Sequence, residues 1–182
     1  MKHALTVMLL AGTFLAAPLA ATAQESSESK STDQTIAKIK QYREAGEEKL
    51  RDNKFTRKEI PLTGPNVKES IKQKWEKMDA YYEGDKLVRL QLYPHKGVSG
   101  RTEEFYLMDD KLVFAYIQDK GPKSEGRDMG QAGKELYFDN DKLIKMEDRS
   151  GEPCANPNQE KKMYESRLPY EISELLDILK KK

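Results

Sequence analysis

The chain has 182 residues, of which 35% are charged and 37% hydrophobic, and its formal net charge is +1. This length fits a single domain. Because proteins dedicated to nucleic-acid binding carry a clear basic excess, the balance of charges argues against a nucleic-acid partner.

The N-terminus has the pattern of a secretory signal peptide. A short basic start precedes an almost wholly apolar segment, 5–19, and Ala21 and Ala23 are the small residues that signal peptidase accepts. The pattern predicts cleavage before Gln24, which would remove residues 1–23 and leave a periplasmic or secreted protein. The alternative is a retained anchor, although the apolar run is shorter than the ~20 residues of a spanning helix. No second apolar stretch follows, so we expect no membrane span after cleavage.

Two segments of different character follow the signal. Residues 24–32 are polar and lack large apolar side chains, which predicts a disordered leader. From 33 to 53, apolar residues such as Ile36 and Ile39 recur at roughly helical spacing, which predicts a helix with a thin apolar stripe. Gly46 within this helix costs up to about 1 kcal/mol relative to alanine. We expect the helix to lie on a sheet or on the surface.

The next segment links this helix to the main unit. Residues 55–62 are predicted to form a short strand that Pro61 stops, and residues 67–72 a brief helical turn. The turn-forming residues 63–66 separate the two. The main unit then runs from about residue 74 to residue 149.

The main unit contains a weak internal repeat of three copies, at residues 82–88, 107–113 and 138–144. Each copy has an aromatic or apolar start, a polar turn and the sequence Asp-Lys-Leu-(Val/Ile). Gly84-Asp85 and Asn140-Asp141 suit the positive φ of tight hairpin turns, whereas Asp109-Asp110 suits it less well and allows a longer loop. Three hairpins in series predict an antiparallel meander. Its six strands are expected at about 74–82, 86–93, 101–108, 111–119, 133–139 and 142–148.

The first hairpin suggests which side chains face the core. A two-residue turn at Gly84-Asp85 would pair Tyr81 with Val88. The more apolar face would then hold Trp75, Tyr81, Val88, Leu90 and Leu92, whereas a slip of one residue would bury Arg89 and Gln91 instead. Adjacent strand residues point to opposite faces, so Glu103 and Glu104 cannot serve one substrate together as an acid–base pair. At most one of the two is expected near the core face, paired with Arg89 or Arg101.

The C-terminal part is predicted to end in an amphipathic helix. After a loop through Pro157, four apolar residues fall at i, i+3, i+4 and i+7: Ile172, Leu175, Leu176 and Leu179. Pro169 suits the first turn of such a helix. We expect the helix to cover the apolar face of the sheet. The predicted fold is therefore a single α+β domain at residues 33–182, in which an N-terminal helix and this helix flank a six-stranded antiparallel β-meander with a hairpin-repeat core at 74–149.

The repeat resembles two groups of proteins. One is the bacterial MORN-like hairpin repeat, which combines tyrosine, an Asn-Gly-like turn, lysine and leucine. Here Asp85, Asp110 and Asp141 stand in place of its glycine. The other is a group of uncharacterised exported bacterial proteins with segments like Thr-Glu-Glu-Phe-Tyr at 102–106 and Tyr-Phe-Asp-Asn-Asp-Lys-Leu-Ile at 137–144. The resemblance covers roughly residues 75–149 and implies a hairpin architecture, but no activity.

The chain offers few residues for catalysis or metal binding. After removal of the signal, His95 is the only histidine, and Cys154 is the only cysteine of the chain. No motif supports a Cys154–His95 dyad, and one histidine with one cysteine cannot fill a zinc ligand set. The run 139–141 lacks the remaining ligands of a calcium loop. We therefore expect no enzyme, no metal site and no cofactor; Cys154 is expected to be an incidental thiol, with a disulfide to another molecule or a thiol adduct as the alternative.

Aromatic residues and loops are the candidates for binding. Tyr82, Tyr106 and Tyr137 are expected on the sheet face opposite the core, where they would form an exposed recognition patch if helices covered one face only, or ordinary packing if helices covered both. His95 in the loop 94–100 and Met129 in the glycine-rich loop 120–133 are further candidates.

The sequence thus predicts an exported, non-enzymatic binding or interaction protein that uses an open sheet face or hairpin loops. Its partner would be a protein, a small molecule or a glycan of the cell envelope. The alternatives are an inhibitor or immunity-type protein directed against an exported enzyme, and a small hydrolase with an unrecognised site.

Overall fold

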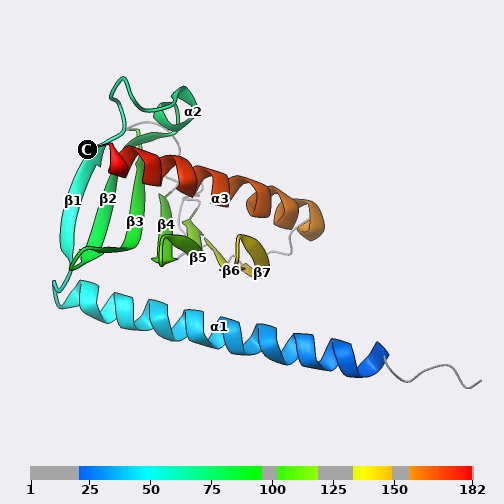
Figure 1. The fold of residues 1–182 in the computed structure, drawn as a ribbon. Coiled ribbons are helices and arrows are strands. Elements are labelled where there is room, and N and C mark those ends of the chain that lie inside the picture. Colours follow the sequence, from blue (N-terminus) through cyan, green and yellow to red (C-terminus); the bar gives the residue numbers. More distant parts are fainter. Residues whose placement is uncertain (1–20, 96–101, 119–132, 149–155, 182) are drawn as a thin grey trace, which may run out of the picture.

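The structure is a computed structural model that describes residues 21–95, 102–118, 133–148 and 156–181, with side chains from Lys30 onward. Three helices and seven strands occur in this part of the chain (Figure 1). In chain order they are α1 (Ala21–Arg51), β1 (Thr56–Pro61), α2 (Glu69–Lys72), β2 (Trp75–Glu83), β3 (Lys86–Pro94), β4 (Thr102–Met108), β5 (Lys111–Gln118), β6 (Gly133–Asp139), β7 (Lys142–Asp148) and α3 (Pro157–Lys180). None of the described helices is long and apolar enough to cross a membrane.

The strands form one antiparallel sheet in the order β1-β2-β3-β4-β5-β6-β7. The predicted α+β class and antiparallel meander are confirmed, but the sheet has seven strands and not six. The additional strand is the segment 55–62, which pairs with β2 from Thr56 opposite Tyr82 to Pro61 opposite Lys77. Pro61 ends this edge strand, a position where its missing N–H breaks no central ladder.

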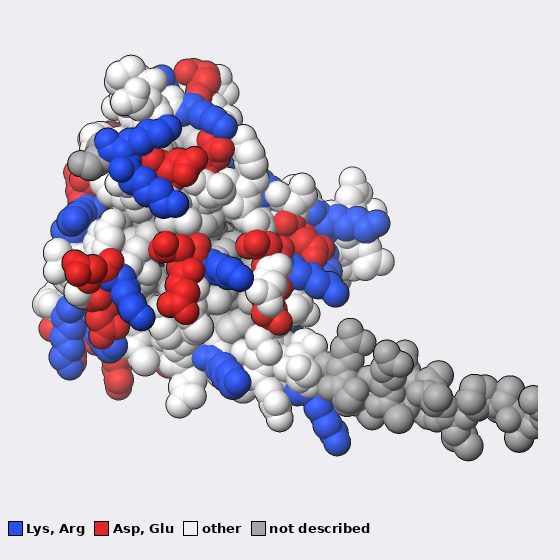
Figure 2. Space-filling model, in the orientation of Figure 1, with Lys and Arg blue, Asp and Glu red and all other residues white. Residues whose placement is uncertain are grey.

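A helix covers each face of the sheet (Figure 1). α3 lies on the face that carries the larger core, with Leu168, Ile172 and Leu175 buried against the strands. α1 crosses the opposite face, where Ile36 and Ile39 pack against a smaller aromatic cluster of Tyr106, Phe114 and Tyr137. Around these layers the surface carries lysine, arginine and acidic side chains side by side (Figure 2).

The three sequence repeats are three hairpins with two-residue turns. Residues pair directly across each turn: Glu83 with Lys86, Met108 with Lys111 and Asp139 with Lys142. Gly84 has φ +61°, and both central residues of the other two turns have positive φ, as type I′ turns require. The longer loop that we allowed at Asp109-Asp110 is therefore not formed. Aspartate tolerates the left-handed region better than most side chains do.

Each hairpin also has a β-bulge at the same place in the repeat. In the first, Tyr82 pairs with Leu87 and Tyr81 with Arg89, so Val88 is the extra residue. Val113 and Ile144 are the extra residues of the second and third hairpins. The predicted pairing of Tyr81 with Val88 is therefore wrong, because the extra residue shifts the register of everything beyond it.

The bulges decide which face each side chain occupies. The repeat leucines Leu87, Leu112 and Leu143 enter the core beneath α3. Past the bulge, Arg89 and Phe114 lie on the α1 face, and Arg89 is only 3% exposed. In the predicted register, Val88 and not Arg89 was the residue that faced the core. Trp75, Leu90 and Leu92 lie in the larger core as predicted, so Arg89 is buried on the opposite face and not through a slip of the whole strand.

α3 is longer at its N-terminus than the sequence suggested. It begins at Pro157, where the Asn156 side chain accepts a hydrogen bond from the backbone N–H of Gln159 at 3.4 Å. Pro169 therefore lies inside the helix and not in its first turn. An internal proline costs a helix about 3 kcal/mol, and the burial of Leu168 and Ile172 on either side of Pro169 offsets that cost.

α1 is also longer than predicted. It begins at Ala21 and includes residues 24–32, for which we had expected a disordered leader. The segment contains no proline or glycine before Gly46, so nothing in it breaks a helix. Burial against the sheet begins only at Ile36.

Candidate functional site

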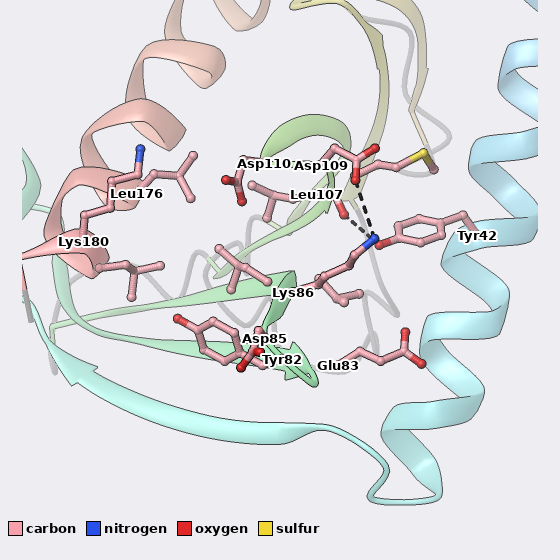
Figure 3. Close-up of a pocket in the computed structure, with 14 residues that line it drawn as sticks. Tyr42, Tyr82, Glu83, Asp85, Lys86, Leu107, Asp109, Asp110, Leu176 and Lys180 are labelled. Carbon is pink, nitrogen blue, oxygen red and sulfur yellow. Dashed lines mark hydrogen bonds and ion pairs between the residues drawn. The ribbon is translucent and has the colours of Figure 1, made fainter.

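A hollow of about 640 Å³ opens at the turn end of the sheet, between α1 and α3 (Figure 3). Five elements and two turns build it. The first two hairpins supply most of the wall, α3 supplies Leu176, Leu179 and Lys180, and α1 supplies Tyr42. Figure 3 shows Leu176 and Lys180 of α3 facing the turn residues across this space. We call it the turn-end hollow.

The inner wall of the turn-end hollow is apolar. Leu87 and Leu107 are buried at its base, and Tyr82, Leu176 and Leu179 are half-buried around them. Burial, together with the nearby charge of Asp110, raises the pKa of the Tyr82 phenol. The wall therefore offers aliphatic and aromatic contacts in a space open to solvent.

The rim of the hollow is charged, with an acidic excess. Its carboxylates are Glu83, Asp85, Asp109 and Asp110, and its cations are Lys86 and Lys180. Lys86 Nζ lies 3.9 Å from Asp109 Oδ1, but both side chains are more than 80% exposed, so this ion pair contributes little stability. Within the described residues, neither Asp85 nor Asp110 forms an ion pair, and both are exposed. These two carboxylates are thus available to a cationic group.

Tyr42 links the hollow to α1. Its hydroxyl donates a hydrogen bond to the backbone carbonyl of Leu107 at 2.7 Å. Burial, with added repulsion from Glu83 and Asp109, raises the pKa of the Tyr42 phenol. The hydroxyl therefore stays protonated at neutral pH and holds α1 to the second hairpin.

A smaller hollow, of about 230 Å³, adjoins the first along α3. The two share Asp110, Leu176 and Lys180, and the smaller one is also lined by Asp141 of the third turn and by Ile172. The second turn residue of every hairpin therefore lines one of these two spaces. Together they form a groove, the α3–turn groove, with α3 on one side and the row of turns on the other.

A different polar cluster holds α1 to its face of the sheet. Arg43 lies 2.5 Å from Glu135 Oε1 and over the ring of Phe114, and Glu135 also accepts a hydrogen bond from the Tyr137 hydroxyl at 2.9 Å. The Tyr106 hydroxyl donates to Glu47 of α1 at 2.5 Å. Burial and these carboxylates raise the pKa of both phenols. Since its charges meet protein partners, this cluster serves to dock α1.

Buried charges also occur beneath α3. The Trp75 indole donates to Glu171 Oε1 at 2.7 Å, and Arg167 bonds Glu103 at 3.0 Å. Glu103 therefore faces α3, whereas Glu104 lies on the α1 face, 2.9 Å from Arg89. The two glutamates occupy opposite faces as expected. The core-face residue, Glu103, pairs with Arg167, whereas Arg89 pairs with Glu104 on the opposite face, so the predicted pairing of the core-face glutamate with Arg89 is wrong; Arg101 lies outside the described residues.

The structure does not bring the predicted binding residues together. Tyr82 lines the turn-end hollow. Tyr106 and Tyr137 are 0% and 1% exposed, and α1 covers the face on which they lie. His95 is half-buried, and its Nε2–H donates to the carbonyl of Lys72 at 2.6 Å. Met129, like Cys154, lies outside the described residues.

Sequence reasoning did not single out the groove residues. Asp85, Asp110 and Asp141 were interpreted as turn formers, and Leu176 and Leu179 as part of a core-facing stripe. The available signal was that aspartate recurs at the second position of all three turns. In the second and third turns, both central residues have the positive φ of a type I′ turn, where glycine is the usual second residue. In the part of the chain that the structure describes, no group of three or more histidine, cysteine or acidic side chains is placed to hold a metal ion.

No protein-family model, no curated protein and no solved structure matches this chain. Membership of a hairpin-repeat family therefore stays a hypothesis that rests on the repeat itself.

Proposed function

We propose that this protein is an exported, non-enzymatic binding protein whose ligand occupies the turn-end hollow. The observation that carries the proposal is the combination of an apolar inner wall with a charged, exposed rim in a space of about 640 Å³. That volume lies within the range of known ligand pockets, which are mainly apolar with a few polar groups that orient the ligand. Export is inferred from the N-terminal pattern.

The lining residues favour binding over covalent catalysis. The side chains of the turn-end hollow are aliphatic, tyrosine, methionine, lysine and acidic, and none is a serine, cysteine or histidine. Nucleophilic catalysis generally needs such a side chain next to a base. His95, the histidine of the conceivable Cys154–His95 dyad, instead bonds the backbone of Lys72.

A hollow-blocking variant tests this proposal. Leu176→Trp places a larger ring in the turn-end hollow, and Met163→Trp is the matched control because Met163 is an exposed residue of the same helix. The mature chain and both variants are first compared by circular dichroism. Each then serves as bait for the envelope fraction of the native organism, and binding of the neutral apolar dye Nile red is measured by fluorescence.

We expect the wild-type chain and Met163→Trp to bind Nile red and to retain the same envelope component, and Leu176→Trp to lose both. Equal dye binding and equal retention by all three folded proteins would contradict the proposal.

A further inference from the structure

The α3–turn groove extends the turn-end hollow past all three hairpins. Its apolar side is the C-terminal half of α3 with residues at the base of the turns; these include Ile172, Leu176, Leu179, Leu87 and Leu112. Its other side is the row of turns. The groove is therefore a partly apolar surface that runs past all three turns.

The row of turns presents one carboxylate per repeat to the groove. Asp85, Asp110 and Asp141 occupy the second turn position of the three hairpins, and all three line the groove. All three are exposed, and none forms an ion pair within the described part of the chain. The cations beside them are partly engaged: Lys86 lies near Asp109, and Lys111 donates to Asn140. Lys180 is the remaining groove cation, and Asp177 adds a further carboxylate.

Turn geometry favours glycine, asparagine or aspartate at these positions, but it does not require a carboxylate. Asp110 and Asp141 have φ +61° and +64°, where glycine is less strained than any side chain. Asp85 follows Gly84, which already supplies the positive φ of its turn. Hairpin folding thus permits aspartate at these positions without requiring its charge, and the three carboxylates share their position along the groove.

The spacing of the row selects the shape of the occupant. Successive hairpins are two strands apart, so equivalent turn residues repeat about every 10 Å across the sheet. An α-helix rises about 10.5 Å in seven residues, which is close to two full turns, so residues seven apart lie on one side. A β-strand has no residue spacing that gives both 10 Å and a constant face, because its side chains alternate. Of these two regular structures, the helix therefore fits the row.

We propose that the α3–turn groove binds a basic amphipathic helix of a partner polypeptide. Lysine or arginine at seven-residue intervals would meet Asp85, Asp110 and Asp141, and apolar residues of the helix would pack on Leu176 and Leu179. This inference rests on the proposed function, since the groove contains the turn-end hollow, and it specifies the chemistry of the ligand.

Two synthetic peptides test the inference against the mature chain, residues 24–182. Both are amphipathic helices with the same leucine face; one carries lysine and the other glutamate at every seventh position. Titration calorimetry is run at low and at raised salt. We expect the lysine peptide to bind at least tenfold more tightly than the glutamate peptide, and raised salt to weaken its binding, because exposed charges are screened.

Protein variants locate the contact. The triple variant Asp85→Asn, Asp110→Asn and Asp141→Asn keeps residues that tolerate positive φ, so its hairpins should fold. Its matched control is Asp33→Asn, Glu44→Gln and Glu48→Gln, which removes three exposed carboxylates of α1. We expect about tenfold weaker binding of the lysine peptide by the groove variant and unchanged binding by the control.

The possible failures are distinguishable. Equal binding of the lysine peptide to the wild-type chain and the groove variant overturns the inference. So does binding of the glutamate peptide alone, or of neither peptide; in these two cases the proposed function stands if Leu176→Trp still abolishes retention of the envelope component. If Leu176→Trp changes neither dye binding nor retention, the proposed function fails as well.

Discussion

At the scale of single residues, Gly46 determines how closely α1 approaches the sheet. A Cβ atom at this position would lie 2.8 Å from Cε1 of Tyr106. That ring cannot easily yield, because it is fully buried, its hydroxyl bonds Glu47 and its edge packs on Phe114 at a centroid distance of 6.0 Å. Glycine therefore permits close packing of α1 on Tyr106, although its helix propensity is low.

Gly46→Ala is therefore expected to lower the free energy of unfolding, by about 1–3 kcal/mol. In an unconstrained helix the same change would raise it by about 1 kcal/mol. Urea denaturation measures the difference. The control is Gly46→Ala in a Tyr106→Leu background, where removal of the ring should reverse the sign. A stabilising effect in the wild-type background would show that α1 does not approach Tyr106 this closely.

The turns allow a pair of opposite substitutions. Gly84 has φ +61°, and a Cβ atom there would meet no heavy atom within 4 Å. Gly84→Ala therefore carries only a backbone cost and should lower the free energy of unfolding by about 1 kcal/mol.

Asp141 has φ +64°, so Asp141→Gly should raise the free energy of unfolding by about 0.5 kcal/mol. Thermal and urea denaturation of the two single variants and of the double variant check both signs. Additive effects are expected, because the turns belong to different hairpins. A destabilised Asp141→Gly would contradict the left-handed geometry of that turn.

At the scale of elements, the docking of α1 depends on a partly buried ion pair. Glu135 is 3% exposed in its side chain and has Arg43 at 2.5 Å. Removal of one partner of such a pair leaves the other charge in a poor environment, which costs more than the pair itself contributes. The stacking of Arg43 over Phe114 adds to its contribution.

Arg43→Met is expected to destabilise the protein by about 2 kcal/mol, as measured by urea denaturation. Hydrogen exchange should show faster exchange in α1 than in α3, since the lost contact is on the α1 face. Arg51→Met is the matched control, because Arg51 is an exposed basic residue of the same helix and forms no ion pair among the described residues. Equal effects of the two variants would mean that the pair with Glu135 does not hold α1.

Element positions followed from sequence patterns, whereas registers did not. Turn residues and the Asp-Lys-Leu-(Val/Ile) repeat were enough to place the strands from β2 to β7 within a few residues. The bulges at Val88, Val113 and Ile144 change no composition, so only the repeated Leu-(Val/Ile) pair, which interrupts strict alternation, signalled them. Pro169 misplaced the start of α3 because burial of its neighbours outweighs a local helix penalty.

At the scale of the whole molecule, the two faces of the sheet differ in kind. The α3 face is mainly apolar, whereas the α1 face combines aromatic rings with charged and phenolic partners. The thin apolar stripe of α1 did not indicate that this helix would cover the tyrosines expected on an open face. Sequence patterns did not predict the candidate groove either, because α3 and the turns that form it are distant in sequence and meet only in the folded chain.

The polar α1 face makes the protein sensitive to alkaline pH. Burial, together with hydrogen bonds to Glu47 and Glu135, raises the pKa of the Tyr106 and Tyr137 phenols above the unfolded value of about 10. A raised folded-state pKa means that the stabilisation is complete below pH 10 and is lost as the pH rises above it, since only the unfolded chain then releases these protons.

Glu147 has the opposite pH dependence. Its folded-state pKa is lowered, chiefly by the hydrogen bond with Lys145, so its contribution to stability is lost as the pH falls below about 4.5.

We expect the free energy of unfolding to be nearly constant from pH 8 to 9 and to fall above pH 10, by up to about 3 kcal/mol per pH unit for two phenols. Urea denaturation at each pH measures this slope, and the difference in tyrosinate absorbance between the wild-type chain and Tyr137→Phe should appear together with unfolding and not before it. Tyr137→Phe should reduce the slope, whereas Tyr170→Phe should leave it unchanged, because Tyr170 is 59% exposed. A wild-type slope that Tyr137→Phe does not alter would mean that the Tyr137 phenol does not contribute to the alkaline transition.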